Sequence, residues 1–124
     1  MDNFTLFSKW LNQVLEKDIP NGIKAFNFNL YEGSEDTYDV ELIGSDEFDE
    51  NDPDWACSNY FTSGENFLYL KRTPEIQHWE DGLNYITLLI KRYLEEGENV
   101  NILKSGSAIG IGFVDGDIDS IFQT

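Results

Sequence analysis

The chain has 124 residues, with 8 basic and 24 acidic side chains, which give a formal net charge of −16. Its length allows one domain over residues 1–124, and its 40% hydrophobic and 15% aromatic content excludes a disordered acidic chain. Because so negative a surface repels phosphate groups, we expect no direct contact with nucleic acid or with anionic lipid.

The first third of the chain predicts a helix followed by a β-hairpin. Apolar residues recur at helical spacing over residues 3–17, with Asp2 or Asn3 as the cap and Pro20-Asn21-Gly22 as the end. Residues 24–31 and 37–43 alternate between apolar and polar side chains, which indicates two half-buried strands joined by the loop 32–36. The core face of these strands is predicted to carry Phe26, Phe28, Leu30, Tyr38, Val40 and Leu42.

The middle of the chain predicts two further strands and a second helix. Residues 44–53 have the composition of a loop, and residues 55–60 and 67–71 are read as short strands. Helical spacing then returns between Pro74 and Glu96, with Gly97 as the stop. Because Gly82 lies inside this span, we expect the regular helix to begin only near Asp81.

The last segment predicts a second hairpin, with Asp115-Gly116 as a two-residue turn. Pairing outward from this turn places three pairs on the core face: Phe113 with Ile118, Ile111 with Ser120, and Ile109 with Phe122. Gly110 and Gly112 fall on the other face, where strand glycines mark a bulge or the close approach of another backbone.

These elements predict an α+β fold in the order α-β-β-β-β-α-β-β. We expect an antiparallel sheet of about five to six strands with two helices packed on one face. The only cysteine, Cys57, excludes an internal disulfide and is expected to be a small buried side chain. With no secretory signal and no apolar run long enough to cross a bilayer, the sequence predicts a cytoplasmic protein.

A run of acidic residues is the most distinctive feature of the sequence. No lysine or arginine occurs between Lys24 and Lys71, and Phe48 and Trp55 are interleaved with the carboxylates of this interval. Charges steer an encounter with a basic surface and an aromatic side chain anchors it, so this segment is the predicted partner-binding site. Its residues are Asp46, Glu47, Phe48, Asp49, Glu50, Asp52, Asp54 and Trp55.

Two other interpretations of this segment remain open. The acidic run is also typical of a solvated surface that keeps a protein soluble. Phe48 is equally compatible with a role inside the protein, in which it holds the loop down onto the core. A weak, incidental cation site at 46–54 stays open as well.

The sequence offers no catalytic, metal or cofactor site. Asp115 to Asp119 begins like a calcium-binding loop, but Ser120 stands where such a loop needs glycine. One histidine, His78, and one cysteine do not make a zinc site, and no carboxylate pair is singled out for acid–base work. We therefore expect no enzyme activity, no metal and no cofactor.

Three stretches of the second half resemble small bacterial immunity-type proteins, the antitoxin partners in polymorphic toxin systems. They are Asp54-Trp55-Ala56-Cys57, the tryptophan-led helix from Trp79 to Tyr93, and Ile-Gly-Phe-Val-Asp-Gly-Asp from Ile111 to Asp117. The resemblance covers residues 54–122 and implies a small, acidic, cytoplasmic α+β domain that binds and blocks one toxin. It transfers no binding residue to a particular position.

The leading hypothesis is a non-enzymatic immunity protein, a monomer or weak homodimer, that occludes the basic groove of a toxin. In this hypothesis the carboxylates of the acidic loop 44–54 replace phosphates in the toxin groove, with Trp55 or Phe48 as the apolar anchor. Two alternatives stay open: a regulatory or housekeeping module that binds a small molecule or dimerises through its sheet, and a metal-dependent hydrolase.

Overall fold

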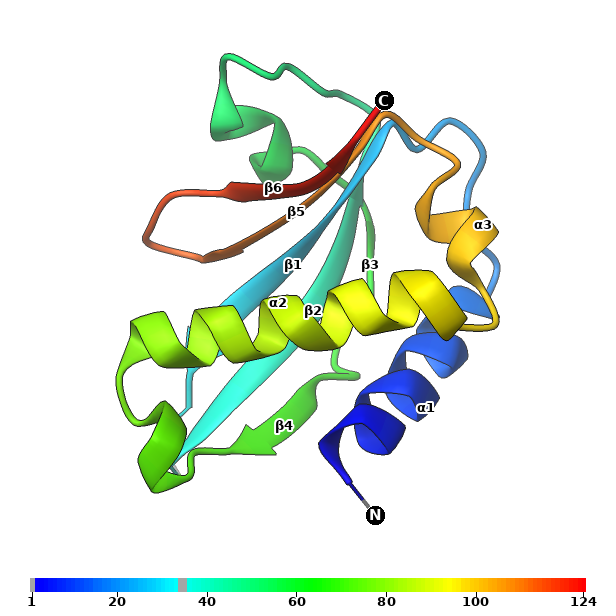
Figure 1. Ribbon diagram of the computed structural model, residues 1–124. Helices are drawn as coiled ribbons and strands as arrows, with labels where there is room; N and C mark the ends of the chain where they lie inside the picture. The colour runs from blue at the N-terminus through cyan, green and yellow to red at the C-terminus, as the bar shows by residue number, and fades with distance from the viewer. Residues whose placement is uncertain (1, 34–35) are drawn as a thin grey trace.

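The computed structural model describes residues 2–33 and 36–124, so Ser34 and Glu35 of the predicted loop 32–36 lie outside the described residues. One mixed six-stranded sheet, three α-helices and two short 3₁₀ helices form an α+β fold (Figure 1). In chain order the elements are α1 (Asn3–Leu15), β1 (Ala25–Glu32), β2 (Thr37–Ser45), η1 (Pro53–Cys57), β3 (Asn59–Thr62), β4 (Leu68–Lys71), η2 (Pro74–Ile76), α2 (Trp79–Glu96), α3 (Val100–Leu103), β5 (Ala108–Phe113) and β6 (Asp119–Gln123).

The sheet is mixed, so the prediction of a purely antiparallel sheet is wrong. The strand order is β3-β2-β1-β5-β6, and β1 pairs in parallel with β5, from Ala25 opposite Ala108 to Leu30 opposite Phe113. The reason lies in the connection. Hairpins make antiparallel neighbours, whereas the helix α2 carries the chain back along the sheet before β5 begins, which is the route that joins parallel strands.

The core lies between the sheet and the helices α1 and α2, which cover one face of the sheet (Figure 1). The alternation predicted for β1 and β2 is confirmed, because Phe26, Phe28 and Leu30 are fully buried in this core. Asp2 caps α1 by accepting a hydrogen bond from the backbone N–H of Thr5, at 2.8 Å. The prediction of two helices is incomplete, because a third, short helix, α3, follows α2 and adds apolar side chains to the same core.

Two short strands share one edge of β2. Residues 37–40 of β2 pair with β4, residues 43–45 pair with β3, and Ser63 bridges the interval between them. The backbone of Leu42 exchanges hydrogen bonds with Ser63, whose N–H donates to the Leu42 carbonyl at 2.8 Å and whose hydroxyl accepts from the Leu42 N–H at 3.2 Å.

The predicted strand 55–60 is wrong in its first half, because residues up to Cys57 belong to the 3₁₀ helix η1. Asp52 caps η1 through the Asp54 N–H, at 3.0 Å.

The start of α2 is fixed by the buried side chain of Tyr38. Its hydroxyl donates to the carbonyl of Ile76, at 2.7 Å, in the turn that precedes the helix. Gly82 lets the ring approach the helix, since a Cβ there would lie 2.8 Å from the Tyr38 hydroxyl oxygen and closer still to the ring. The helix begins at Trp79, two residues before the predicted start, and ends at Gly97 as predicted.

The C-terminal hairpin exists, but its turn and most of its predicted register are wrong. A bulge between Ile109 and Gly110 leaves Ile109 opposite Phe122, as predicted, and shifts Ile111 to Asp119. Because of this bulge the connection runs over 114–118, and Ile118 packs on the opposite side of the sheet from the main core. The glycine interpretation is confirmed, since the register shifts between Ile109 and Gly110 and a Cβ at Gly112 would lie 3.2 Å from the backbone carbonyl carbon of Asp117.

Tyrosine ionisation is expected to limit stability at high pH. The pKa of Tyr93 lies above its ordinary value of 10.0, because the effect of burial, which raises it, outweighs the effect of the hydrogen bond from the Asn99 backbone, which lowers it. Burial also raises the pKa of Tyr38, and burial together with the hydrogen bond to Glu41 raises the pKa of Tyr31. A pKa above the unfolded value means that the folded state holds the proton more tightly. This stabilisation is complete below about pH 10 and is lost as the pH rises through the folded pKa.

The check is urea unfolding at a series of pH values from 8 to 11. The Tyr93→Phe variant should be less stable at pH 8, because the hydroxyl bond to Asn12, at 2.6 Å, is lost. Its free energy of unfolding should then fall less steeply above pH 10 than that of the parent. The same exchange at the exposed Tyr69 is the control. Parallel profiles for Tyr93→Phe and the parent would contradict this assignment.

Candidate functional site

The structure packs both aromatic residues of the predicted site against the sheet, with Trp55 buried and Phe48 partly buried. Trp55 is 7% exposed and packs edge-on against Phe48, with ring centroids 5.4 Å apart. Both belong to a second apolar cluster, on the sheet face opposite α1 and α2, together with Ala25, Ile43, Ala56, Ala108 and Ile118. The hydroxyl of Ser45 donates to the Trp55 carbonyl, at 2.8 Å, and completes this attachment. These contacts favour the interpretation in which the aromatic side chains hold the loop onto the sheet.

The carboxylates of the predicted site lie on the surface. Asp46, Glu47, Asp49, Glu50, Asp52 and Asp54 are all exposed. Two of them organise the loop itself: Asp49 accepts from the Asn51 N–H, at 2.9 Å, and Asp52 caps η1. Glu50 accepts from the Gln123 side chain, at 2.7 Å, which ties the loop to β6. The segment therefore presents charge to solvent, while its two aromatic rings face the sheet.

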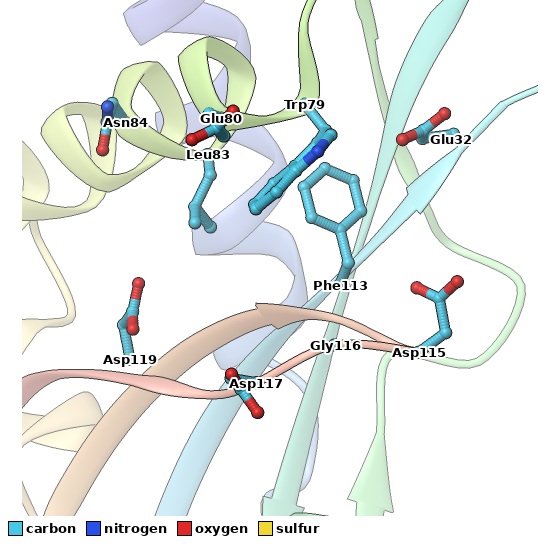
Figure 2. A pocket seen from close by; sticks show the side chains of 10 residues that line it. All are labelled: Glu32, Trp79, Glu80, Leu83, Asn84, Phe113, Asp115, Gly116, Asp117 and Asp119. Carbon is cyan, nitrogen blue, oxygen red and sulfur yellow. The ribbon is translucent and has the colours of Figure 1, made fainter.

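A second acidic surface lies on the other side of the β5–β6 hairpin, where a groove of about 560 Å³ separates this hairpin from the first turns of α2 (Figure 2). We call it the acidic groove. Half of its lining residues carry carboxylates, and no lysine, arginine or histidine lines it. The lining residues are Glu32, Trp79, Glu80, Leu83, Asn84, Phe113, Asp115, Gly116, Asp117 and Asp119.

Trp79 is the central aromatic side chain of the acidic groove. It is 51% exposed, and its ring meets the ring of Phe113 edge-on, with centroids 6.0 Å apart and an interplanar angle of 88° (Figure 2). Phe113 in turn contacts the buried ring of Tyr38, also at 6.0 Å. Since Tyr38 is bonded to the turn before α2, this row of rings holds Trp79 in a fixed position at the surface.

The carboxylates around Trp79 are almost free of internal partners. Within residues 2–33 and 36–124, Glu32 is the one groove residue in an ion pair, with Arg72 at 3.5 Å. The other four acidic residues, Glu80, Asp115, Asp117 and Asp119, are exposed. Such uncompensated charges repel one another and attract a cation from solution.

Sequence reasoning did not find the acidic groove. It assigned Trp79 to a helix, Asp115-Gly116 to a two-residue turn and the residues from Asp117 onward to a strand, and it expected this hairpin to neighbour other strands in antiparallel order. The parallel pairing of β1 with β5 brings Glu32, the end of β5 and the start of α2 to one place. The signal in the sequence was the spacing of acids in Asp115-Gly116-Asp117-Ile118-Asp119, which marks a strongly charged hairpin tip.

The structure corrects the prediction for Cys57, which is exposed rather than buried, because it ends η1 at the surface. His78 is exposed at the residue before α2, and its side chain makes no capping bond. Among the described residues, no group of three or more histidine, cysteine, aspartate or glutamate side chains is arranged to hold a metal ion. No helix in the described ranges is long and apolar enough to cross a membrane.

Comparison of the chain with protein-family models, with curated proteins and with solved structures finds no match.

Proposed function

We propose that this chain is a non-enzymatic binding protein that holds a basic protein partner in its acidic groove. The observation that carries the proposal is Trp79, a half-exposed ring fixed at the surface of a groove whose lining holds five carboxylates and no lysine, arginine or histidine. Tryptophan is the residue type most enriched in the anchors of protein interfaces. Surrounding charges raise the association rate and select the sign of the partner.

The partner proposed is a toxin domain, which the chain neutralises as an immunity protein by covering a basic active-site groove. The charge of −16 is suited to such a groove, because carboxylates replace the phosphates that it binds. The exposed carboxylates of loop 46–54 lie on the opposite side of the hairpin and are proposed as a second contact. In this form of the proposal Trp79 replaces Trp55 and Phe48 as the anchor, since the latter two pack on the sheet.

The first experiment is a growth test in a host that expresses the open reading frame immediately upstream, with and without this chain. Rescue of growth, with co-purification of the two products, is the expected result. An upstream product that is harmless, or that kills whether or not the chain is present, would remove the toxin assignment. Native mass spectrometry of the chain alone then tests the alternative, a module that binds a small molecule or dimerises, by looking for a bound ligand or a stable dimer.

Two matched quadruple variants locate the docking surface on the partner recovered from that test. One neutralises the groove (Glu80→Gln, Asp115→Asn, Asp117→Asn, Asp119→Asn), and the other neutralises the loop (Asp46→Asn, Glu47→Gln, Asp49→Asn, Glu50→Gln). Each removes four negative charges, so their effects on long-range attraction are similar. We expect the groove variant to slow association at least about tenfold at low salt and to flatten its salt dependence.

The loop variant is the control for net charge, and it should slow association by a smaller factor. Stopped-flow measurements at several salt concentrations give the association rate of each variant and its salt dependence. Equal association rates for the two variants would show that the contact is not centred on the groove. A larger effect of the loop variant would indicate that residues 46–54 are the main docking surface.

A further inference from the structure

The chain contains two places where an arginine lies on an aromatic ring beside a carboxylate. The guanidinium carbon of Arg72 lies 4.5 Å from the ring centroid of Tyr38, and its Nη2 is 3.5 Å from Glu32. The guanidinium carbon of Arg92 lies 3.9 Å from the ring centroid of Phe4, and its Nε is 3.4 Å from Glu96. In both places a ring and a carboxylate together hold one guanidinium, the ring through its face and the carboxylate through an ion pair.

The acidic groove also brings an aromatic ring, that of Trp79, and carboxylates into one lining, but with no cation among its lining residues. Carboxylates of Glu80, Asp115 and Asp117 line the groove with it, and none of the lining residues is basic. Phe113 meets the Trp79 ring edge-on, which leaves half of the Trp79 surface open to the groove (Figure 2). Tryptophan is also the aromatic side chain that attracts a cation most strongly.

We propose that the acidic groove holds an arginine side chain of the basic protein partner, with its guanidinium stacked on Trp79 and its N–H groups donating to the groove carboxylates. This deepens the proposed function and rests on it for the identity of the partner as a protein. Arginine is favoured over lysine for three reasons: its planar group stacks on a ring, its five donors suit several carboxylates, and it is less strongly hydrated than an ammonium. The groove, at about 560 Å³, is large enough for this side chain and the backbone on either side of it.

The intrinsic fluorescence of the chain provides a direct readout. Of the three tryptophans, Trp10 is 5% exposed and Trp55 is 7% exposed, so emission that responds to a ligand in solution reports mainly on Trp79. The probes are three blocked pentapeptides, Gly-Ser-Xaa-Ser-Gly, in which Xaa is arginine, lysine or citrulline. Citrulline has nearly the shape of arginine but carries no charge, so it isolates the contribution of the cation.

We expect the arginine peptide to change the Trp79 emission in a saturable way and to bind at least about tenfold more tightly than the citrulline peptide. The lysine peptide should fall between them. The groove quadruple variant should lose the preference for arginine over citrulline, whereas the loop quadruple variant, with the same net charge, should keep it. Binding of the peptides to Trp79→Leu, followed by NMR, should show no preference for arginine.

Equal affinity for the arginine and citrulline peptides, or a preference that survives in both Trp79→Leu and the groove variant, would overturn this proposal. Circular dichroism of each variant establishes that it is folded before its peptide binding is compared with that of the parent protein. The outcome is separable from that of the growth test. Arginine preference without rescue of growth would support the arginine site and remove the toxin assignment. Rescue of growth without arginine preference would support the toxin assignment and remove the arginine site.

Discussion

Replacing Trp55 with alanine is expected to lower the free energy of unfolding by about 3–5 kcal/mol, the range for large aromatic side chains removed from a packed site. Trp55 is 7% exposed and is the largest side chain of the cluster that attaches loop 46–54 to the sheet. Its loss would leave a cavity between Phe48 and the strands, because the neighbouring side chains Ala25, Ala56 and Ala108 are too small to fill it. Equilibrium unfolding in urea measures the change.

The matched control is the same substitution at Trp79, which is 51% exposed and should cost less than about 1 kcal/mol. The two variants therefore separate an internal anchor from an external one. Hydrogen exchange adds a local readout, since Trp55→Ala should speed exchange in residues 46–58 before it affects β1. A stability loss at Trp79 that equals the loss at Trp55 would contradict the distinction drawn between the two rings.

Alanine at Gly82 is expected to destabilise the protein by about 1–3 kcal/mol, the cost of forcing a methyl group into a packed core. This reverses the usual effect, since alanine in place of glycine within an exposed helix stabilises by about 1 kcal/mol. The reason is Tyr38: a Cβ at position 82 would lie 2.8 Å from its hydroxyl oxygen, and the ring cannot retreat because it is buried. Either the ring moves, with loss of its bond to the Ile76 carbonyl, or the first turn of α2 moves.

A movement of the first turn of α2 would displace Trp79 as well, so Gly82→Ala should also weaken the binding of the arginine peptide in the fluorescence titration. A double-mutant cycle with Tyr38→Leu tests the cause. Once the ring is removed, adding Gly82→Ala should cost little or should stabilise. A control substitution at the exposed Lys91 of the same helix, to alanine, should change stability by less than about 0.5 kcal/mol. If Gly82→Ala stabilised the parent protein, the close contact with Tyr38 would be disproved.

The parts of the fold that the sequence predicted correctly depend on local patterns. The spacing of Phe7, Leu11 and Val14 defines the buried face of α1, and the alternation around Phe28 defines β1. The Asp2 cap and the Gly97 stop are likewise properties of a few adjacent residues. Such signals are read one element at a time, and here they identified each long helix and strand.

The features that the sequence missed depend on interactions between distant elements. Parallel pairing of β1 with β5 follows from the path of α2 across the sheet, which no local pattern records. The register shift opposite Ile109 and Gly110 changes the face of the β6 side of the hairpin, so Ile118 lies opposite to its predicted side, whereas Ile111 keeps its predicted place in the core. For the site, the exposure of the loop carboxylates was predicted, whereas the burial of Trp55 and the exposure of Trp79 were not. The burial of Trp55 depends on the apolar cluster on the second sheet face, and the position of Trp79 depends on the approach of Phe113 to the start of α2, and no local pattern records either.

The division of one β2 edge between β3 and β4 has a consequence for behaviour at high concentration. Unpaired strand edges are templates on which other chains add strands, and long straight edges are the most exposed to this. Here the outer edge on that side consists of two four-residue strands joined around Ser63, and neither offers a long run of free backbone groups. At the opposite edge β6 has five residues, begins with Asp119 and pairs through a bulge. Since like charges also repel between copies, we expect the architecture to resist edge-to-edge aggregation at high protein concentration.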